Sequence, residues 1–157
     1  EEYVLAWKHV RKVVRQVAGF RVGLLWSPYV RSIPETPENA IERYFPGAGN
    51  VDFVGVSGYN FGTTGDLTWT DPAPLFATAY ATIQGLAHKP FWITETGSTS
   101  TGGSKPAWVA SLGSLKAEMP MLRGIVWFDV ADPHGDFRLV GPASRVARSL
   151  VQGRCLA

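Results

Sequence analysis

The chain has 157 residues, 45% of them hydrophobic and 18% charged, and its 15 basic and 13 acidic side chains leave a net charge of +2. This composition supports a packed core and excludes an intrinsically disordered chain. The charge is too small and too evenly scattered for a nucleic-acid partner, and no apolar run reaches the roughly 18 residues that would predict a membrane span.

Helix and strand patterns alternate along the chain. Apolar residues at three- and four-residue spacing over residues 2–18 predict an amphipathic helix, with Gly19 as its C-terminal cap. Short apolar runs predict four strands, at residues 21–26, at 51–57, in the run that opens at Pro90 and holds Glu95, and at 123–129. Further helices are predicted around 38–44 and at 74–86, 105–119 and 142–151.

Repeated βα units predict an α/β fold with a parallel sheet and right-handed crossovers. Four strands can form a small doubly wound domain. They can equally form half of a (β/α)8 barrel of the TIM-barrel type, which typically takes about 250 residues. No linker or repeat divides the sequence, so residues 1–157 are predicted to be one unit.

Unusual side chains gather where the predicted strands end. They are Trp26 with Ser27 and Pro28, Tyr59 with Asn60, Glu95, and Trp127 with Asp129. Parallel strands end on the same side of a sheet, so these groups are expected to converge. A buried unpaired carboxylate is costly, so Glu95 must be paired or lie at the open mouth of the sheet. Tyr59 and Trp127 can equally be core rings, and Asp129 more often caps the following loop.

A carboxylate flanked by a tyrosine and tryptophan rings suits the cleavage of glycosidic bonds. Retaining hydrolysis uses a carboxylate nucleophile and a second carboxylic acid about 5–5.5 Å away. A tyrosine hydroxyl can hydrogen-bond the nucleophile and favour its charged form. A tryptophan ring can stack on the apolar face of a sugar.

Four motifs resemble glycoside hydrolase family 26. They are Trp-Ser-Pro at 26–28, the stretch 51–62, Ile-Thr-Glu-Thr-Gly-Ser at 93–98, and Ile-Val-Trp-Phe-Asp at 125–129 with Asp-Phe-Arg at 136–138. The opening residues 3–10 are similar to the helix after strand four of that family. Its members are (β/α)8 barrels, most of them secreted β-mannanases with retaining chemistry. The resemblance therefore implies that this chain forms strands five to eight, a C-terminal half barrel.

The resemblance also implies site residues. Glu95 would be the catalytic nucleophile on strand seven, Tyr59 its hydrogen-bonding partner on strand six, and Trp127 a sugar platform on strand eight. The predicted substrate-binding set is completed by Trp26, Asn60 and Asp129. The implied substrate is a polysaccharide or oligosaccharide of β-1,4-mannan or a related β-glycan, and the implied location is secreted or extracellular.

The sequence departs from the family at several positions. The family often has Asn at the position of Tyr29, Asp at Ser57 and Trp at Phe137. Its acid/base glutamate sits in a His-Glu-x-Asn-Gly type motif on strand four, and none of the three histidines here is followed by Glu. The resemblance thus implies that the proton donor belongs to a missing N-terminal half of the barrel. Loss of general acid–base help alone costs about 10²–10⁴-fold in rate.

The start of the chain is consistent with a cut through a longer protein. The sequence opens with two glutamates, without Met and without the basic and apolar regions of a signal peptide. Cys155 is the single cysteine and cannot form an internal disulfide. The histidines, at positions 9, 88 and 134, are isolated, so we expect neither a metal nor another cofactor.

Two other hypotheses remain, and a third is set aside. The chain could be a non-catalytic carbohydrate-binding or remnant domain without turnover of its own. Asp129 or Asp136 could act as the acid, which would make the fragment itself an enzyme, although Asp129 more often caps a loop. A flavodoxin-like nucleotide binder would need a Gly-rich loop after its first strand, and this sequence has none.

Overall fold

The computed structural model describes residues 1–152, and Cys155 lies outside the described residues. Its main sheet has four strands, β1 (Leu25–Trp26), β2 (Phe53–Asn60), β3 (Phe91–Ser98) and β4 (Leu122–Trp127). All three neighbouring pairs are parallel, and the strand order β1-β2-β3-β4 follows the sequence. A doubly wound sheet reverses its order at a switch point, whereas a β/α barrel keeps it. The structure therefore has an α/β fold with a parallel sheet and contradicts the doubly wound alternative.

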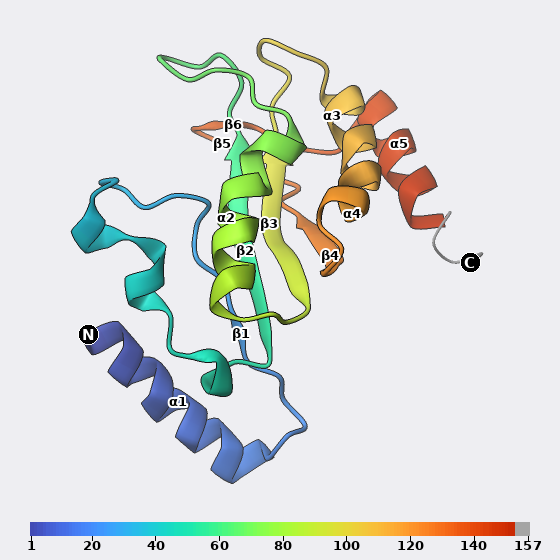
Figure 1. The fold of residues 1–157 in the computed structure, drawn as a ribbon. Coiled ribbons are helices and arrows are strands. Elements are labelled where there is room, and N and C mark those ends of the chain that lie inside the picture. The colour runs from blue at the N-terminus through green and yellow to red at the C-terminus, as the bar shows by residue number, and fades with distance from the viewer. Residues whose placement is uncertain (153–157) are drawn as a thin grey trace.

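Five helices accompany the sheet in the described part of the chain. They are α1 (Glu2–Ala18), α2 (Pro72–Leu86), α3 (Lys105–Ser111), α4 (Leu115–Glu118) and α5 (Gly141–Gln152). The prediction of α1 is confirmed at both ends: Gly19 has φ 58° and its N–H donates to the Arg15 carbonyl at 3.0 Å. Figure 1 shows α2 against the sheet, α1 beside the β1 end, and α3 and α5 together at the β4 side.

Several predicted elements differ in the structure. The predicted helix at 105–119 is divided by a 3-10 turn at Leu112–Ser114, where Gly113 is a poor helix former. The helix predicted around 38–44 is a pair of 3-10 turns, Pro37–Asn39 and Ile41–Tyr44. The predicted loop after β4 contains an antiparallel hairpin of β5 (Ala131–Asp132) and β6 (Gly135–Asp136).

One face of the sheet is mostly buried under helices, with Ile125 and Trp127 of β4 partly buried on it. Its strand residues Val54, Val56, Phe91 and Ile93 are 0% exposed, as are Phe76 and Ile83 on the facing side of α2. The ring of Tyr80, also on α2, packs edge-on against Phe91 with centroids 4.9 Å apart. We call this the helix-covered face, and it holds most of the hydrophobic core.

The opposite face carries the alternate residues of the same strands. Residues 53, 55, 57 and 59 of β2 share it, because side chains alternate along a strand. It is far less buried: Phe53 is 36% exposed, and Val126 of β4 is 50% exposed. We call this the open face.

Helix α1 is attached to the rest of the chain by a few polar contacts, and none of its residues is buried. The Trp7 indole N–H donates to the Asn50 carbonyl at 2.9 Å, and the Arg15 guanidinium pairs with Asp52. The Asp52 carboxylate also accepts from the Leu24 N–H at 2.7 Å. Burial raises the pKa of Asp52, but these hydrogen bonds outweigh it and leave the pKa lowered. Among the described helices, none has the length and apolar character needed to cross a membrane.

Candidate active site

Glu95 lies on an irregularity of β3. The pairing with β2 runs from Val56 opposite Ile93 directly to Ser57 opposite Glu95, so Thr94 is an extra residue on β3. Such a β-bulge re-aims the side chains that follow it, and bulges are common beside active sites. Here it places Glu95 on the open face with its partner Ser57, and the Glu95 side chain is exposed. The carboxylate is therefore available to a ligand at the end of the strand.

Two hydroxyl groups hold this bulge in place. The Thr94 hydroxyl donates to the Val56 carbonyl at 3.1 Å and also hydrogen-bonds the Ser27 hydroxyl. Since the Thr94 proton is used toward Val56, Ser27 is the donor in the second bond. These contacts join the residue after β1 to β2 and to the residue of β3 that precedes Glu95. Thr94 thus fixes the backbone from which the carboxylate projects.

Tyr59 is a diagonal neighbour of Glu95 on the open face. Its register partner is Gly97, two residues beyond Glu95. The Tyr59 ring packs against three phenylalanines, with centroid separations of 5.6 Å to Phe61, 5.8 Å to Phe128 and 5.4 Å to Phe137. The hydrogen bonds among residues 1–152 do not include one between the Tyr59 hydroxyl and Glu95. That partnership stays a prediction, while the side chains do share one face.

Trp127 points to the other side of the sheet. It is the register partner of Thr96, which is 0% exposed on the helix-covered face. Its ring packs edge-on against Trp108 of α3 at 5.8 Å, and its indole N–H donates to the Phe137 carbonyl at 2.8 Å. The next residue, Phe128, is the one that joins Tyr59. The role of Trp127 as a sugar platform therefore stays a prediction, and its observed contacts position the segment around Phe137.

Trp26 is a core side chain in this structure. It is 1% exposed and packs edge-on against Phe45 with centroids 5.0 Å apart. Stacking on a sugar would require this packing to open. The residue's burial corrects the expectation that its ring is presented at the mouth of the sheet.

Asn60 is also buried, with 1% of its surface exposed. Its amide nitrogen donates to the Ser98 hydroxyl at 2.9 Å, and its amide oxygen accepts from the N–H groups of Gly62 and Thr70, both at 3.1 Å. These bonds use the side chain to anchor the loop after β2. The structure therefore gives Asn60 a positioning role, and its contact with substrate stays a prediction.

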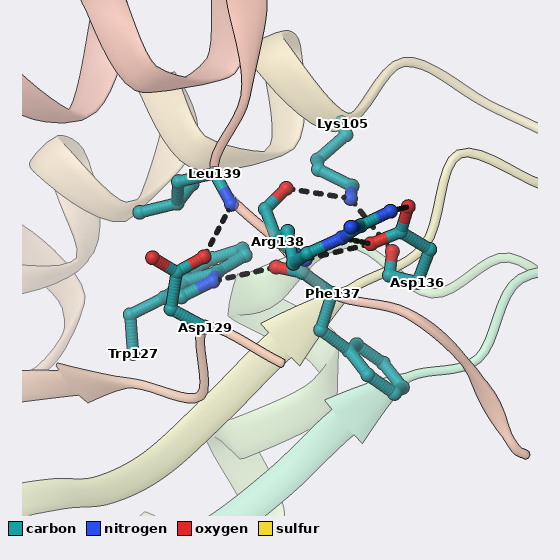
Figure 2. Close-up of polar contacts among 7 residues, drawn as sticks. All are labelled: Lys105, Trp127, Asp129, Asp136, Phe137, Arg138 and Leu139. Carbon is teal, nitrogen blue, oxygen red and sulfur yellow. Dashed lines mark hydrogen bonds and ion pairs between the residues drawn. The ribbon is translucent and has the colours of Figure 1, made fainter. Parts of the chain in front are cut away.

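The segment after the β5–β6 hairpin is bound from several sides, as Figure 2 shows. Lys105 of α3 is 6% exposed and its ammonium donates to the carbonyls of Asp136 at 2.7 Å and Arg138 at 3.0 Å. Burial lowers the pKa of Lys105, and the Asp136 carboxylate opposes that shift. Asp129 accepts from the Leu139 N–H at 2.6 Å, as expected of a loop cap.

An ion pair lies on the outside of the same segment. Asp136 accepts from the Arg138 guanidinium at 2.9 and 2.8 Å. These bonds lower the pKa of Asp136 and raise that of Arg138. Between the two residues, the Phe137 ring is 1% exposed and lies against Gly97, where an added Cβ would come within 2.8 Å of it. The segment thus supplies the ring that packs against Gly97 and Tyr59 on the open face.

The sequence did not single out Thr94, Phe61, Phe128 or Phe137 for the site. The signal for Phe128 was present in the spacing, since it follows Trp127 by one residue and therefore lies on the opposite face. No sequence pattern predicts the bulge at Thr94. Within residues 1–152, no group of three or more His, Cys, Asp or Glu side chains could hold a metal ion.

The arrangement is that of an α/β fold resembling glycoside hydrolases. The chain is 27% identical over 131 residues to Endoglucanase H of Acetivibrio thermocellus, a match that covers 82% of this chain and 14% of that protein. No family model matches the chain. Family 26 membership, implied by the motifs, therefore stays a prediction.

Two solved structures share the fold. An endo-β-1,3-glucanase of family 128, subgroup II, from Sorangium cellulosum has a TM-score of 0.60 at 21% identity, covering 94% of this chain and 60% of that chain. A subgroup I enzyme of the same activity from Amycolatopsis mediterranei, in complex with laminaritriose and laminaribiose, has a TM-score of 0.59 at 17% identity, covering 92% and 65%. This chain therefore spans less than two thirds of the solved chains and a small part of the curated relative.

Proposed function

We propose that the chain is the C-terminal half of the catalytic barrel of a retaining glycoside hydrolase, with Glu95 as the nucleophile. The single observation that carries this proposal is the exposed Glu95 carboxylate, aimed by a bulge onto the same face as Ser57 and Tyr59. The strand order and the fold shared with endo-β-1,3-glucanases support it. The four strands then correspond to strands five to eight of a (β/α)8 barrel.

In this mechanism the Glu95 carboxylate attacks the anomeric carbon of the sugar. The bond to the leaving oxygen breaks as a second carboxylic acid protonates that oxygen, and a glycosyl-enzyme ester forms on Glu95. Water, deprotonated by the second carboxylate, then cleaves the ester. The motif resemblance assigns that second carboxyl group to strand four, outside this sequence.

Two aspartates of this chain are poor candidates for the missing acid. Asp136 is held in its charged form by Arg138, since its pKa is lowered and an acid must carry a proton. Asp129 uses one oxygen to cap the Leu139 N–H. Both therefore act better as positioning groups for the segment that carries Phe137.

For the substrate, we propose a β-1,4-mannan or a related β-linked glucan. The motif resemblance favours mannan, whereas the named relatives are an endoglucanase and endo-β-1,3-glucanases. A secreted location follows from the same resemblance and stays a prediction. The alternative of a carbohydrate-binding domain without turnover is favoured by the aromatic cluster around Tyr59, which could hold a sugar without cleaving it.

The test is to trap the glycosyl-enzyme on this chain. Activated 2-deoxy-2-fluoro-mannosyl and -glucosyl fluorides need little proton donation to their leaving group, so they can react without the second carboxyl. We expect intact mass and peptide mapping to show one label, on Glu95. Glu95→Gln should abolish the label, and Glu118→Gln, which alters an exposed glutamate on α4, should not.

The opposite result is equally clear. A chain that circular dichroism shows to be folded, yet that acquires no label on Glu95 with either fluoride, would reject the nucleophile assignment. Binding of oligosaccharides by that unlabelled chain would then favour the carbohydrate-binding alternative.

A further inference from the structure

Among residues 1–152, Lys105 is the one charged residue that is buried, with 6% of its surface exposed. The ion pairs among these residues do not include it. Taking a cation out of water is costly unless other groups compensate for the lost hydration. Lys105 also opens helix α3, where the positive end of the helix dipole disfavours a cation. A lysine at this position is therefore explained by what its hydrogen bonds hold.

The Lys105 ammonium holds the backbone of the segment around Phe137, as Figure 2 shows. It donates to the carbonyls of Asp136 at 2.7 Å and Arg138 at 3.0 Å. The Phe137 carbonyl between them accepts from the Trp127 indole N–H at 2.8 Å. An ammonium has three N–H donors, so one side chain can hold both outer carbonyls. Three successive carbonyls are thus bound, and the backbone on both sides of Phe137 is fixed.

The Phe137 ring carries this fixed position onto the open face. It is 1% exposed, and an added Cβ on Gly97 would come within 2.8 Å of it. It also packs against the Tyr59 ring, with centroids 5.4 Å apart. Gly97 and Tyr59 are register partners, and Glu95 lies two residues before Gly97 on the same strand. A series of direct contacts therefore joins Lys105 to Tyr59, the hydroxyl-bearing side chain that shares a face with Glu95.

We propose that Lys105 is a positioning residue of the candidate active site. Through the segment around Phe137 it fixes the Tyr59 ring, so that the Tyr59 hydroxyl can hydrogen-bond the Glu95 carboxylate as the sugar is attacked. Such a bond favours the charged form of the nucleophile. The inference rests on the proposed function, and it adds to the site a residue of α3 that acts only through other side chains.

The first measurement is the rate at which variants of the whole chain are labelled by the glycosyl fluoride. Lys105→Met keeps the apolar stem and removes the ammonium, and labelling at Glu95 should slow about tenfold, because small misplacements slow a reaction strongly. Lys116→Met, which alters an exposed lysine on α4, should label at the wild-type rate. Ile83→Val lowers stability at a residue that is 0% exposed on α2, and it should leave the labelling rate unchanged.

A double-mutant cycle with Tyr59→Phe separates this role from a merely structural one. If Lys105 acts through the Tyr59 hydroxyl, Tyr59→Phe alone should slow labelling about tenfold, and the addition of Lys105→Met should slow it little further. Independent effects would instead multiply to about a hundredfold. A hundredfold loss in the double variant would overturn the inference, and so would a wild-type rate in either single variant.

The position of Tyr59 is measured separately from the chemistry. Nuclear magnetic resonance of the chain with ring-labelled tyrosine observes its five tyrosines, and Tyr59→Phe identifies the Tyr59 signal by its loss. Lys105→Met should shift that signal and leave the signal of Tyr80, which packs on Phe91, in place. A wild-type chain that shows the shift but acquires no label would retain the positioning role and reject the proposed function. A labelled chain whose Tyr59 signal does not move would do the reverse.

Discussion

The two faces of the sheet are built from the same strands and differ in almost every other respect. On the helix-covered face, Val56 and Ile93 are 0% exposed and pack under α2. On the open face, their neighbours Ser57, Thr94 and Glu95 are polar and remain accessible to varying degrees. Glycines occupy the open face at Gly55 and Gly97, where added Cβ atoms would clash with Trp92 and Phe137 respectively. One face is filled for stability, and the other is shaped by close contacts that aim particular groups.

The difference between the two faces indicates which substitutions should affect stability and which should affect activity. Burial of apolar area stabilises a fold by roughly 25 cal/mol per Å², whichever side chains supply it. A reactive carboxylate instead depends on position, so small polar contacts on the open face matter more than their own energies suggest. Substitutions on the helix-covered face should act on unfolding, and those on the open face on reactivity.

The largest effect is expected for Phe76→Ala. The Phe76 ring is 0% exposed between α2 and β2, so its removal leaves a cavity and should cost about 3–5 kcal/mol in the free energy of unfolding. Urea denaturation followed by circular dichroism measures this loss. Phe53→Ala removes the same ring from the open face, where it is 36% exposed, and should cost clearly less. Equal losses at the two positions would contradict the proposed division of the faces.

An intermediate effect is expected for Thr94→Val, which keeps the β-branched shape but removes the hydroxyl. The bonds to Ser27 and Val56 disappear, and the free energy of unfolding should fall by about 1 kcal/mol. The rate of labelling at Glu95 should fall by more, about tenfold, because a misplaced carboxylate reacts slowly.

Thr94→Ser provides the control, since it restores a hydroxyl at the bulge. Rescue of the labelling rate by Ser would assign the effect to the hydrogen bonds. A labelling rate that follows stability alone, in both variants, would show that the bulge does not aim Glu95.

The smallest effect concerns the exposed pair of Asp136 and Arg138. The hydrogen bonds from Arg138 lower the pKa of Asp136 from its ordinary value of 3.8, so the folded state favours the charged carboxylate. The resulting stabilisation is present above the unfolded pKa and is lost as the pH falls through the folded one. Salt should weaken it, because both side chains are at least 50% exposed.

Thermal unfolding of the wild type and of Asp136→Asn checks the direction of this pH dependence. The small advantage of the wild type at pH 7 should shrink progressively below about pH 4, and it should shrink at neutral pH in 1 M salt. An advantage that grows on acidification would show that another group controls the segment.

The sequence predicts the first helix and the buried strands well, because their signals are local and periodic. The apolar spacing and the terminal glycine locate α1 at both ends, and the apolar runs locate β2 and β3. The sheet edge is harder: only Leu25 and Trp26 of the predicted residues 21–26 pair with β2. Strand pairing depends on the neighbouring strand, and a run of apolar residues does not show which of them will pair.

The open face is predicted in part. Glu95 and Tyr59 do lie on one face, because strand alternation and parallel pairing bring them together. Asn60 and Trp127 fall on the other face, one residue away in each case, since a shift of one position exchanges the two sides of a sheet. The bulge at Thr94 depends on hydroxyl contacts among β2, β3 and the residue after β1, and contacts across long sequence separations are invisible in a single sequence.

The edge-to-face pair of Trp108 and Trp127 has an optical consequence. Two indoles with centroids 5.8 Å apart couple their strong electronic transitions, so the pair should give a distinctive far-ultraviolet dichroism couplet. One ring belongs to α3 and the other to β4, so the couplet depends on the docking of that helix on the sheet. The couplet therefore reports whether β4 has joined the main sheet and α3 has packed against it. It needs no label and no bound sugar.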